Sequence, residues 1–368
     1  MPSGPDWLFK PQNVELANTY RSFAALPDIF APIGDPAPGV VTTHDEFAIS
    51  FTREEAKRKV RDLLSTATEA DARRQFRLCS QAQWSYERAK SELAQLNLDS
   101  HVVRLLYRPF DKRWTVWNRN VAVHRRERVM SHMREGNLGL VTSRLTKGED
   151  FKHALITDLP IEVISLSPKT SNNGFLFPLY IYSKDGRRAE SLSSEFRSFI
   201  DSQYEHHYTP EEVLAYIYAV LHAPAYRMVY AELLRIDFPR LPFPEAAKDF
   251  ETLSTLGWAL VQAHLLREVP RRRLGAYHGK GDHSVEAVRY SPADQAIVIN
   301  KSQFFRPVPQ AVWDFHIGGY QVLDKYLKSR KGRVLSLDEI NHVAAVADSL
   351  AFTIDQMAKI DEAYRAAF

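Results

Sequence analysis

The segment RLLYRPFDKRWTVWNRN, residues 104–120, begins the run of sequence that decides the fold class. β-Branched and aromatic residues are frequent in five short stretches, namely RWTVW (113–117), LGLVTSR (138–144), HALIT (153–157), EVISLS (162–167) and FLFPLYIYS (175–183). Turn-forming segments such as KGED and KTSNNG separate them, which is typical of successive strands. We therefore expect a β-rich section over residues 101–183.

Helical patterns lie on both sides of this section. Before it, FAISF (47–51) resembles a short strand, Thr52 is placed to cap a helix in TREEAKRKVRDLLS, and a second helix is expected near residues 81–97. After it, Thr209 and Pro210 begin a helical pattern that Pro224 should divide into two helices. Further helices are expected at about 244–268, 309–329 and 336–365, with a hairpin near 285–300. Because strands and helices come in separate blocks, the predicted fold class is α+β.

Two parts are expected along the chain. Residues 1–46 contain prolines at positions 2, 5, 11, 27, 32, 36 and 38 and no sustained apolar period, so this stretch is expected to be an extended strap. Residues 1–100 then form a strap and a small helical coupler section. Residues 101–368 form the second part, β-rich over 101–183 and mainly helical over 190–368.

Composition limits the class of protein. The chain has 368 residues, 45% of them hydrophobic, which is enough for a substantial core. No apolar run approaches the roughly 18 residues that span a bilayer, and no secretory signal is visible, so we expect no membrane association and a cytoplasmic location. The single cysteine, Cys79, excludes an internal disulfide and is expected to be buried or half-buried.

Positive charge is concentrated in one region. Residues 104–153 contain 12 Lys or Arg against 5 Asp or Glu, a balance of +7, whereas the whole chain carries +3. Arginines interleaved with Trp114 and Trp117 are the composition expected where phosphates are neutralised and bases are read. An ordinary solvated surface is the alternative interpretation.

Catalytic motifs are absent from the sequence. There is no GxxxxGK[ST] phosphate loop, no GxSxG elbow and no GxGxxG after a strand. Two histidine pairs and two pairs of adjacent acids lack the spacing of a metal site. Surface or interface positions are the favoured interpretation of the histidines, and a turn or the first turn of a helix explains the acids: His206 with His207, His278 with His283, Glu149 with Asp150, and Glu211 with Glu212. The chain is therefore interpreted as a binding unit. Two other interpretations stay open, a protein-interaction module and a nucleic-acid hydrolase that uses His206, His207 or His283 as a base.

Several segments together resemble one family. They are GVVTTHDEFAISFT (39–52), LLYRPFDKRWTVWNR (105–119), VMSHMREGNLGLVTSRLTKGEDFKHALITD (129–158) and SPKTSNNGFLFPLYIY (167–182), and the likeness continues from residues 209 and 312. In this order they resemble the C-terminal target-recognition region of type ISP restriction-modification enzymes and of related adenine-specific DNA methyltransferases.

The resemblance implies a role for the chain and for its parent protein. Residues 101–368 would be a target-recognition domain for double-stranded DNA, and its other partners would be the methyltransferase and remaining domains of the parent polypeptide. The parent enzyme would use S-adenosylmethionine, with ATP and magnesium for restriction. No cofactor is expected in this chain, whose sequence lacks an NPPY-like motif.

A recognition domain holds phosphates with flexible cations and reads base edges with a few side chains. The residues expected at phosphates are Arg119, Arg125, Arg126, Arg128, Arg144, Lys147, Lys152 and Lys169. A second set could extend this surface, although a solvated loop explains it equally well: Arg271, Arg272, Arg273 and Lys280. Asn118, Asn120, Asn172 and Asn173 are candidates for reading adenine. Turn formation is the favoured alternative for the last two, because SNNG is a natural turn sequence.

The motif RPFDKRW (108–114) has a separate interpretation. Arg108 and Asp111 are expected to form an ion pair that closes a turn around Pro109, with Phe110 buried. Trp114 and Trp117 would lie on opposite faces of a strand, so one of them is expected in the core.

Overall fold

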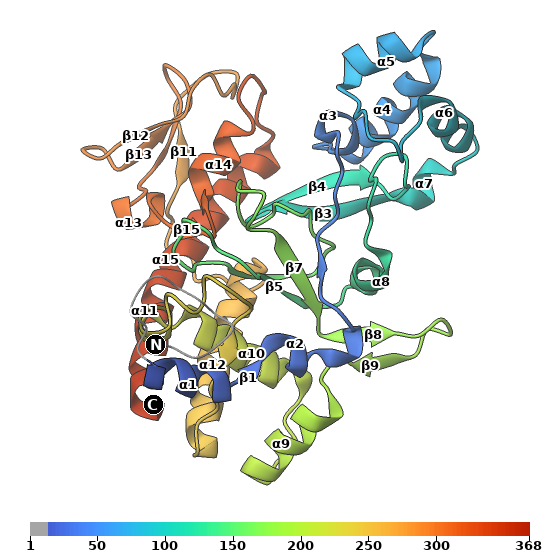
Figure 1. The fold of residues 1–368 in the computed structure, drawn as a ribbon. Helices are drawn as coiled ribbons and strands as arrows, with labels where there is room; N and C mark the ends of the chain where they lie inside the picture. The colour runs from blue at the N-terminus through green and yellow to red at the C-terminus, as the bar shows by residue number, and fades with distance from the viewer. Residues whose placement is uncertain (1–13) are drawn as a thin grey trace.

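A computed structural model describes residues 14–368, and these form an α+β fold as predicted (Figure 1). The first 13 residues of the predicted strap, with the prolines at positions 2, 5 and 11, lie outside the described residues. Three groups of elements surround a central sheet. A small helical group lies at the upper right of Figure 1, a second small sheet lies at the upper left, and a layer of long helices lies below.

The helical group precedes the β-rich section. Its elements are α3 (Asp45–Ala48), α4 (Arg53–Ser65), α5 (Glu69–Phe76), α6 (Tyr86–Ala94) and α7 (Leu98–His101). Thr52 caps α4 by accepting a hydrogen bond from the backbone of Glu55, which confirms the predicted start of this helix. The strand predicted in FAISF is wrong: its first residues belong to α3, and only Ser50 bridges to a strand, at Trp114.

Antiparallel strands form the middle of the molecule. The hairpin β3 (Val102–Arg108) and β4 (Asp111–Val116) stands beside a four-stranded sheet of order β2-β7-β5-β6. That sheet contains β2 (Ala37–Pro38), β5 (Gly139–Ser143), β6 (Ala154–Thr157) and β7 (Gly174–Pro178). Between β4 and β5 in sequence lie α8 (Glu127–Met130) and the 3-10 helix η2 (Ser131–Glu135). A further hairpin, β8 (Tyr180–Tyr182) and β9 (Arg188–Glu190), follows β7.

The predicted strand EVISLS is a turn with isolated bridges. The Glu162 carboxylate accepts a hydrogen bond from the backbone N–H of Ile164 at 2.9 Å, and the Glu162 carbonyl accepts one from Ser165 at 3.0 Å. Ladder pairing is therefore limited to single bridges, Leu106 with Ile161 and Val40 with Glu162. A local side-chain bond has taken the place of strand pairing.

The N-terminal segment runs across several of these elements. After α1 (Val14–Ser22), strand β1 (Ala24–Ala25) pairs with β10 (Arg240–Leu241). The chain continues through α2 (Leu26–Ile29) and η1 (Ala31–Ile33) to β2, which pairs with β7. Residues 24–41, here called the strap, therefore lie against two distant parts of the sequence. The described part of the predicted strap (residues 1–46) is not extended throughout, because it contains the helices α1, α2 and η1.

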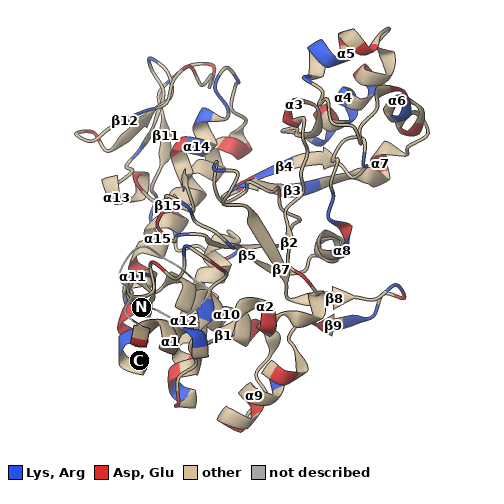
Figure 2. Ribbon diagram, in the orientation of Figure 1, with Lys and Arg blue, Asp and Glu red and all other residues tan. Residues whose placement is uncertain are grey.

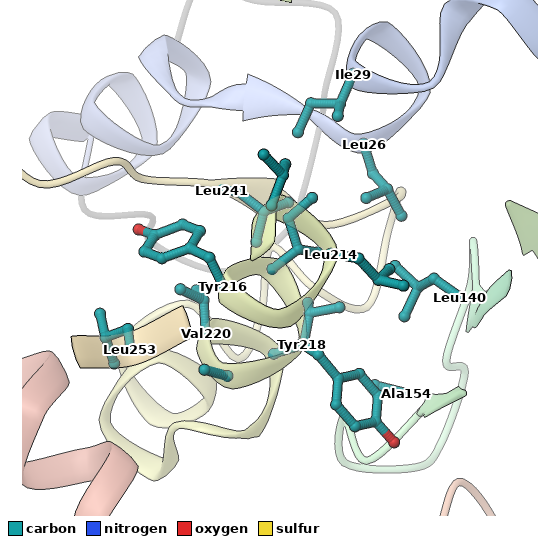
Figure 3. Close-up of a cluster of buried hydrophobic side chains, with 14 of the residues drawn as sticks. Leu26, Ile29, Leu140, Ala154, Leu214, Tyr216, Tyr218, Val220, Leu241 and Leu253 are labelled. Atoms are coloured by element: carbon teal, nitrogen blue, oxygen red, sulfur yellow. The ribbon is translucent and has the colours of Figure 1, made fainter. Parts of the chain in front are cut away.

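Long helices form the largest core. They are α9 (Ser194–Tyr204), α10 (Pro210–His222), α11 (Pro224–Val229), α12 (Ala247–His264) and α15 (Leu337–Ala367). Ten consecutive residues of α10, from position 213 to 222, are buried, and Figure 3 shows its side chains among neighbours from the strap, the sheet and α12. Pro224 divides α10 from α11 as predicted. Among residues 14–368, no helix has the length and apolar character needed to cross a bilayer.

A second four-stranded sheet was only partly predicted. The expected hairpin is β12 (Arg289–Ser291) with β13 (Ala296–Val298), but β11 (Ala276–His278) and β14 (Phe304–Arg306) extend it in the order β11-β14-β13-β12. The helix predicted over 309–329 is interrupted: α13 (Gln310–Trp313) and α14 (Val322–Lys328) flank β15 (His316–Ile317) and β16 (Tyr320–Gln321). Gly318 (φ 56°) makes the turn and leaves no room for a Cβ beside the Leu166 carbonyl.

Candidate nucleic-acid interface

A basic edge begins in the loop that leads to α8. Arg126 is exposed and has a left-handed backbone (φ 51°), while Arg125 is half-buried and pairs with Glu127 at 3.0 Å. Arg128, also expected at phosphates, donates hydrogen bonds to the carbonyls of Ile33 and Asp35 in the strap. Its guanidinium thus serves the fold, so Arg125 and Arg126 are the stronger phosphate candidates here.

The β8–β9 hairpin continues this edge. A pocket of about 690 Å³ is lined by Arg128 and His132 on one side and by Arg187 and Arg188 of the hairpin on the other. Figure 2 shows basic residues on the loop before α8 and on the hairpin below it. We call Arg125, Arg126, Lys184, Arg187 and Arg188 the basic edge. Sequence reasoning missed the last three, although KDGRR (184–188) combines three cations with a turn glycine.

His132 joins the two parts of the edge. Burial lowers the pKa of its imidazole, although a hydrogen bond with the backbone of Arg128 opposes this shift. The lowered pKa favours the neutral ring, whose Nδ1 can accept a hydrogen bond from the backbone N–H of Tyr182 at 3.0 Å. This bond holds strand β8 against η2.

The predicted residues 118–120 are tied to α6. The Asn120 amide donates to the Glu92 carboxylate at 2.7 Å and to the Asn118 side-chain oxygen at 3.0 Å, and Asn120 is fully buried. Arg119 is exposed and forms a bidentate pair with Glu92. Hydrogen bonds from Arg119 and Asn120 lower the pKa of Glu92 to about 2. Asn120 is therefore corrected from a base reader to a structural residue, while Asn118 stays half-buried and Arg119 stays accessible.

A polar network occupies the loops around Glu149. Its carboxylate accepts hydrogen bonds from Ser167 Oγ at 2.9 Å and from Asn172 Nδ2 at 2.8 Å, and it lies 2.9 Å from His153 Nε2. Burial lowers the pKa of His153 to about 4 despite this carboxylate. Asn172 is fully buried and also accepts a hydrogen bond from the Lys147 backbone at 3.0 Å. Asn172 therefore belongs to a turn, and the prediction that it reads a base is corrected because its side chain is buried. Asn173 is half-buried.

Exposed cations surround this network. Lys147, Lys152 and Lys169 are exposed, and the Lys169 ammonium donates to the Gly148 carbonyl at 2.7 Å. Arg144 is 58% exposed and pairs with Asp237 at 2.9 Å. The structure therefore brings Lys147, Lys169 and Asn172 together on adjacent loops, although acidic residues balance part of their charge.

The basic run at 271–273 lies after α12. All three arginines and Lys280 are exposed. Arg272 pairs with Asp355 on α15 at 2.7 Å, and its backbone N–H donates to the Asp348 carboxylate at 3.1 Å. Arg272 thus fastens this loop to α15, and the other cations face solvent.

The RPFDKRW motif forms two buried ion clusters instead of the predicted pair. Arg108 pairs with Glu162, whereas Asp111 accepts two hydrogen bonds from Arg113 at 2.7 Å and one from Arg330 at 3.1 Å. The predicted Arg108–Asp111 pair is wrong because each residue has a different buried partner. Phe110 is buried as predicted.

One tryptophan of the motif lies in the core, also as predicted. Trp117 is 7% exposed. Trp114 is half-buried, and the guanidinium groups of Arg53 and Arg104 lie 5.8 and 5.7 Å from its ring centroid. The two indoles therefore have different environments.

The histidine pairs form no metal site in the described part of the chain, where no three His, Cys, Asp or Glu residues are grouped for a metal ion. His207 pairs with Asp201 at 2.8 Å, and His206 packs on Tyr208. His283 contacts the Tyr277 hydroxyl at 3.0 Å, and His278 stacks on Phe304. Cys79 is half-buried, as expected.

Comparisons with known proteins agree with the resemblance seen in the sequence. A family model described as the type ISP C-terminal specificity domain matches residues 34–358. No curated protein matches. Among solved structures, the fold is similar to a cryo-EM structure of a DrdV–DNA complex (TM-score 0.72, 20% identity), covering 94% of this chain and 38% of that one.

Two type ISP restriction-modification enzymes are also similar. A nuclease-deletion mutant of LlaGI in complex with a DNA substrate mimic gives a TM-score of 0.68 at 17% identity, over 97% of this chain and 35% of that one. ATP-dependent LlaBIII bound to DNA gives 0.74 at 16% identity, over 96% and 25%. The likeness shows a shared fold, and this chain spans well under half the length of each of the three proteins.

Proposed function

From the premise that the chain belongs to the family of type ISP C-terminal specificity domains, we propose that it recognises a target sequence in double-stranded DNA for a restriction-modification enzyme. The family match over residues 34–358 carries this proposal. The basic edge and the exposed cations around residues 147 and 271 support it, because a duplex is held mainly through its phosphates.

The proposed contacts divide by role. Cations at phosphates set the position of the duplex, and few side chains read bases. The phosphate contacts are assigned to Arg119, Arg125, Arg126, Arg144, Lys147, Lys152, Lys169, Arg271, Arg273 and Lys280. Asn118 and Asn173 remain candidates for base reading, because each is only half-buried, whereas Asn120 and Asn172 are fully buried.

The parent enzyme is proposed to be an adenine-specific DNA methyltransferase joined to nuclease and translocase parts. This chain would orient the duplex so that a neighbouring methyltransferase domain can take one adenine out of the stack, which costs a few kcal/mol. S-adenosylmethionine, and ATP with magnesium for restriction, would bind to those other parts. We place the enzyme in the cytoplasm, where its DNA substrate is.

Selection from a duplex library tests the proposal. The purified chain is incubated at about 150 mM salt with duplexes that contain a randomised core, and the retained DNA is sequenced. Enrichment of a motif of several base pairs that includes an adenine is the expected result. Retention without enrichment would contradict sequence recognition by this chain alone. Absence of retention would favour a protein-interaction module.

A further inference from the structure

The β8–β9 hairpin ends in an exposed turn. Tyr182 pairs with Arg188 at the end of the ladder, and the backbone N–H of Ser183 donates to the Arg187 carbonyl at 2.9 Å. Gly186 closes the turn with φ +82°, and no group other than its chain neighbours lies within 4 Å of the place a Cβ would take, so the turn faces open space at this residue. Figure 1 shows the hairpin extending to the right of the molecule, away from the helical layer.

The base of this hairpin is firmly held. The Asn137 side chain brackets Tyr180, donating to its carbonyl at 2.5 Å and accepting from its N–H at 3.3 Å. The Tyr180 hydroxyl donates to Glu211 on α10 at 2.8 Å, and His132 accepts from the backbone N–H of Tyr182. The hairpin is thus a short ribbon fixed at its base to η2 and α10.

Its tip carries three cations, and the side-chain contacts of Arg187 and Arg188 are with the hairpin itself. Residues 183–189 are all exposed, and Arg187 has a side-chain exposure of 85%. Arg187 pairs only locally, with Asp185 at 2.7 Å, and such an exposed pair stabilises a fold little. The Arg188 guanidinium lies 4.2 Å from the Tyr180 ring centroid, which orients it along the ribbon. Strand β8 packs Tyr180 and Ile181 against the core, whereas the charged residues at the tip of the hairpin have no such contact, so the tip is free to meet an anionic partner.

We propose that the tip of the β8–β9 hairpin enters the major groove of the duplex, with Arg187 reading a guanine. The inference rests on the proposed DNA recognition. The major groove admits a two-stranded ribbon, and a guanidinium can donate two hydrogen bonds to guanine O6 and N7. Lys184 and Arg188 flank Arg187 and contact the phosphates on either side of the groove. Arg125 and Arg126, on the same edge, follow the backbone beyond it.

Two variants and one matched control test this assignment by the library selection and by titrations on the selected duplex and a scrambled one. R187K keeps the charge but loses the planar fork of donors. R187A/R188A removes both tip guanidiniums. K359A/R365A removes two exposed cations from the C-terminal end of α15, on the other side of the molecule in Figure 1.

R187K is expected to weaken binding to the selected duplex by about 10- to 100-fold and to relax one G·C position of the motif, with scrambled-duplex affinity and salt slope unchanged. R187A/R188A weakens binding to both duplexes, and K359A/R365A changes neither. A melting temperature equal to that of the wild type shows that each variant keeps its fold. If R187K selects the same motif with the same affinity as the wild type, the groove assignment is wrong and the proposed function is unaffected. If the wild-type chain retains no duplex, both the proposed function and the groove assignment are wrong.

Discussion

Replacing Asp111 by asparagine should strongly destabilise the fold. The Asp111 side chain is 1% exposed and is shared by the guanidiniums of Arg113 and Arg330. Burial alone would raise the pKa of Asp111, but the hydrogen bond from Arg113 and the charges of both arginines lower it below its usual value. The carboxylate therefore stays ionised. It compensates the buried charge of Arg113, and it shares Arg330 with Glu339, whose carboxylate lies 2.8 Å from the Arg330 guanidinium.

The size of the effect follows from what is left behind. An asparagine in place of Asp111 keeps the shape but removes the negative charge and presents an N–H₂ group to one of the guanidiniums, which stay stacked near the Phe51 ring. Removing one member of a buried ion cluster typically costs about 3–5 kcal/mol, because the remaining charge is buried without compensation. A domain has about 5–15 kcal/mol of stability in total, so D111N should unfold at much lower denaturant concentration.

Urea unfolding followed by circular dichroism measures this change. The double variant D111L/R330M removes a negative and a positive charge together, and it should recover part of the loss, since apolar replacement of a buried pair is often tolerated. A D111N chain destabilised by less than about 1 kcal/mol would refute the reasoning. A D111L/R330M chain whose loss of stability equals the sum of the losses in D111L and R330M would also refute it, because the two residues would then be independent.

Three further predictions concern DNA affinity, pH and packing. R125E/R126E should weaken binding to all duplexes and reduce the slope of log affinity against log salt by about 2, and an unchanged slope would remove this loop from the interface. Burial lowers the pKa of His44 to about 4 and of His264 to about 3, below the ordinary 6.5. The unfolded chain therefore binds more protons below pH 6.5, so unfolding free energy should fall by about 1.4 kcal/mol per pH unit for each histidine as pH drops from about 6.5 to about 4. Urea midpoints that show the same pH dependence in H264Q would contradict this. G257A should lower the stability by about 1–3 kcal/mol, because its Cβ would lie 1.9 Å from a backbone carbonyl of α10; an unchanged melting temperature would contradict the close approach.

Local signals in the sequence predicted individual elements well. The Thr52 cap, the break at Pro224 and the β12–β13 hairpin all depend on residues close to one another in the chain, and all are confirmed. Predictions failed where the partner of a buried charge decides the outcome. Arg108 pairs with Glu162 from a distant segment, and EVISLS lacks strand pairing because the Glu162 carboxylate binds its own backbone, which no hydrophobic pattern reveals.

The candidate site follows the same division. Charge density identified the loop around Arg126, and composition alone suffices for that. Burial separated Asn120 and Asn172 from the true surface residues, and burial depends on Glu92 and Glu149 in other segments. The tip at 184–188 was missed because it follows the predicted strand FLFPLYIYS (175–183) directly and lies outside the region of concentrated positive charge at 104–153.

The strap has a consequence for exchanging specificity between relatives. Its β1 completes a pairing with β10, and its β2 forms the edge of the sheet next to β7, while Arg128 holds its carbonyls from α8. In a chimera joined at residue 100, β1 and β2 would come from one protein and their partners β10 and β7 from the other. The side chains at both pairings would then be mismatched. A transplant that carries residues 24–41 together with β7 and β10 keeps both pairings. The segment to exchange therefore begins at the strap and not at the β3–β4 hairpin.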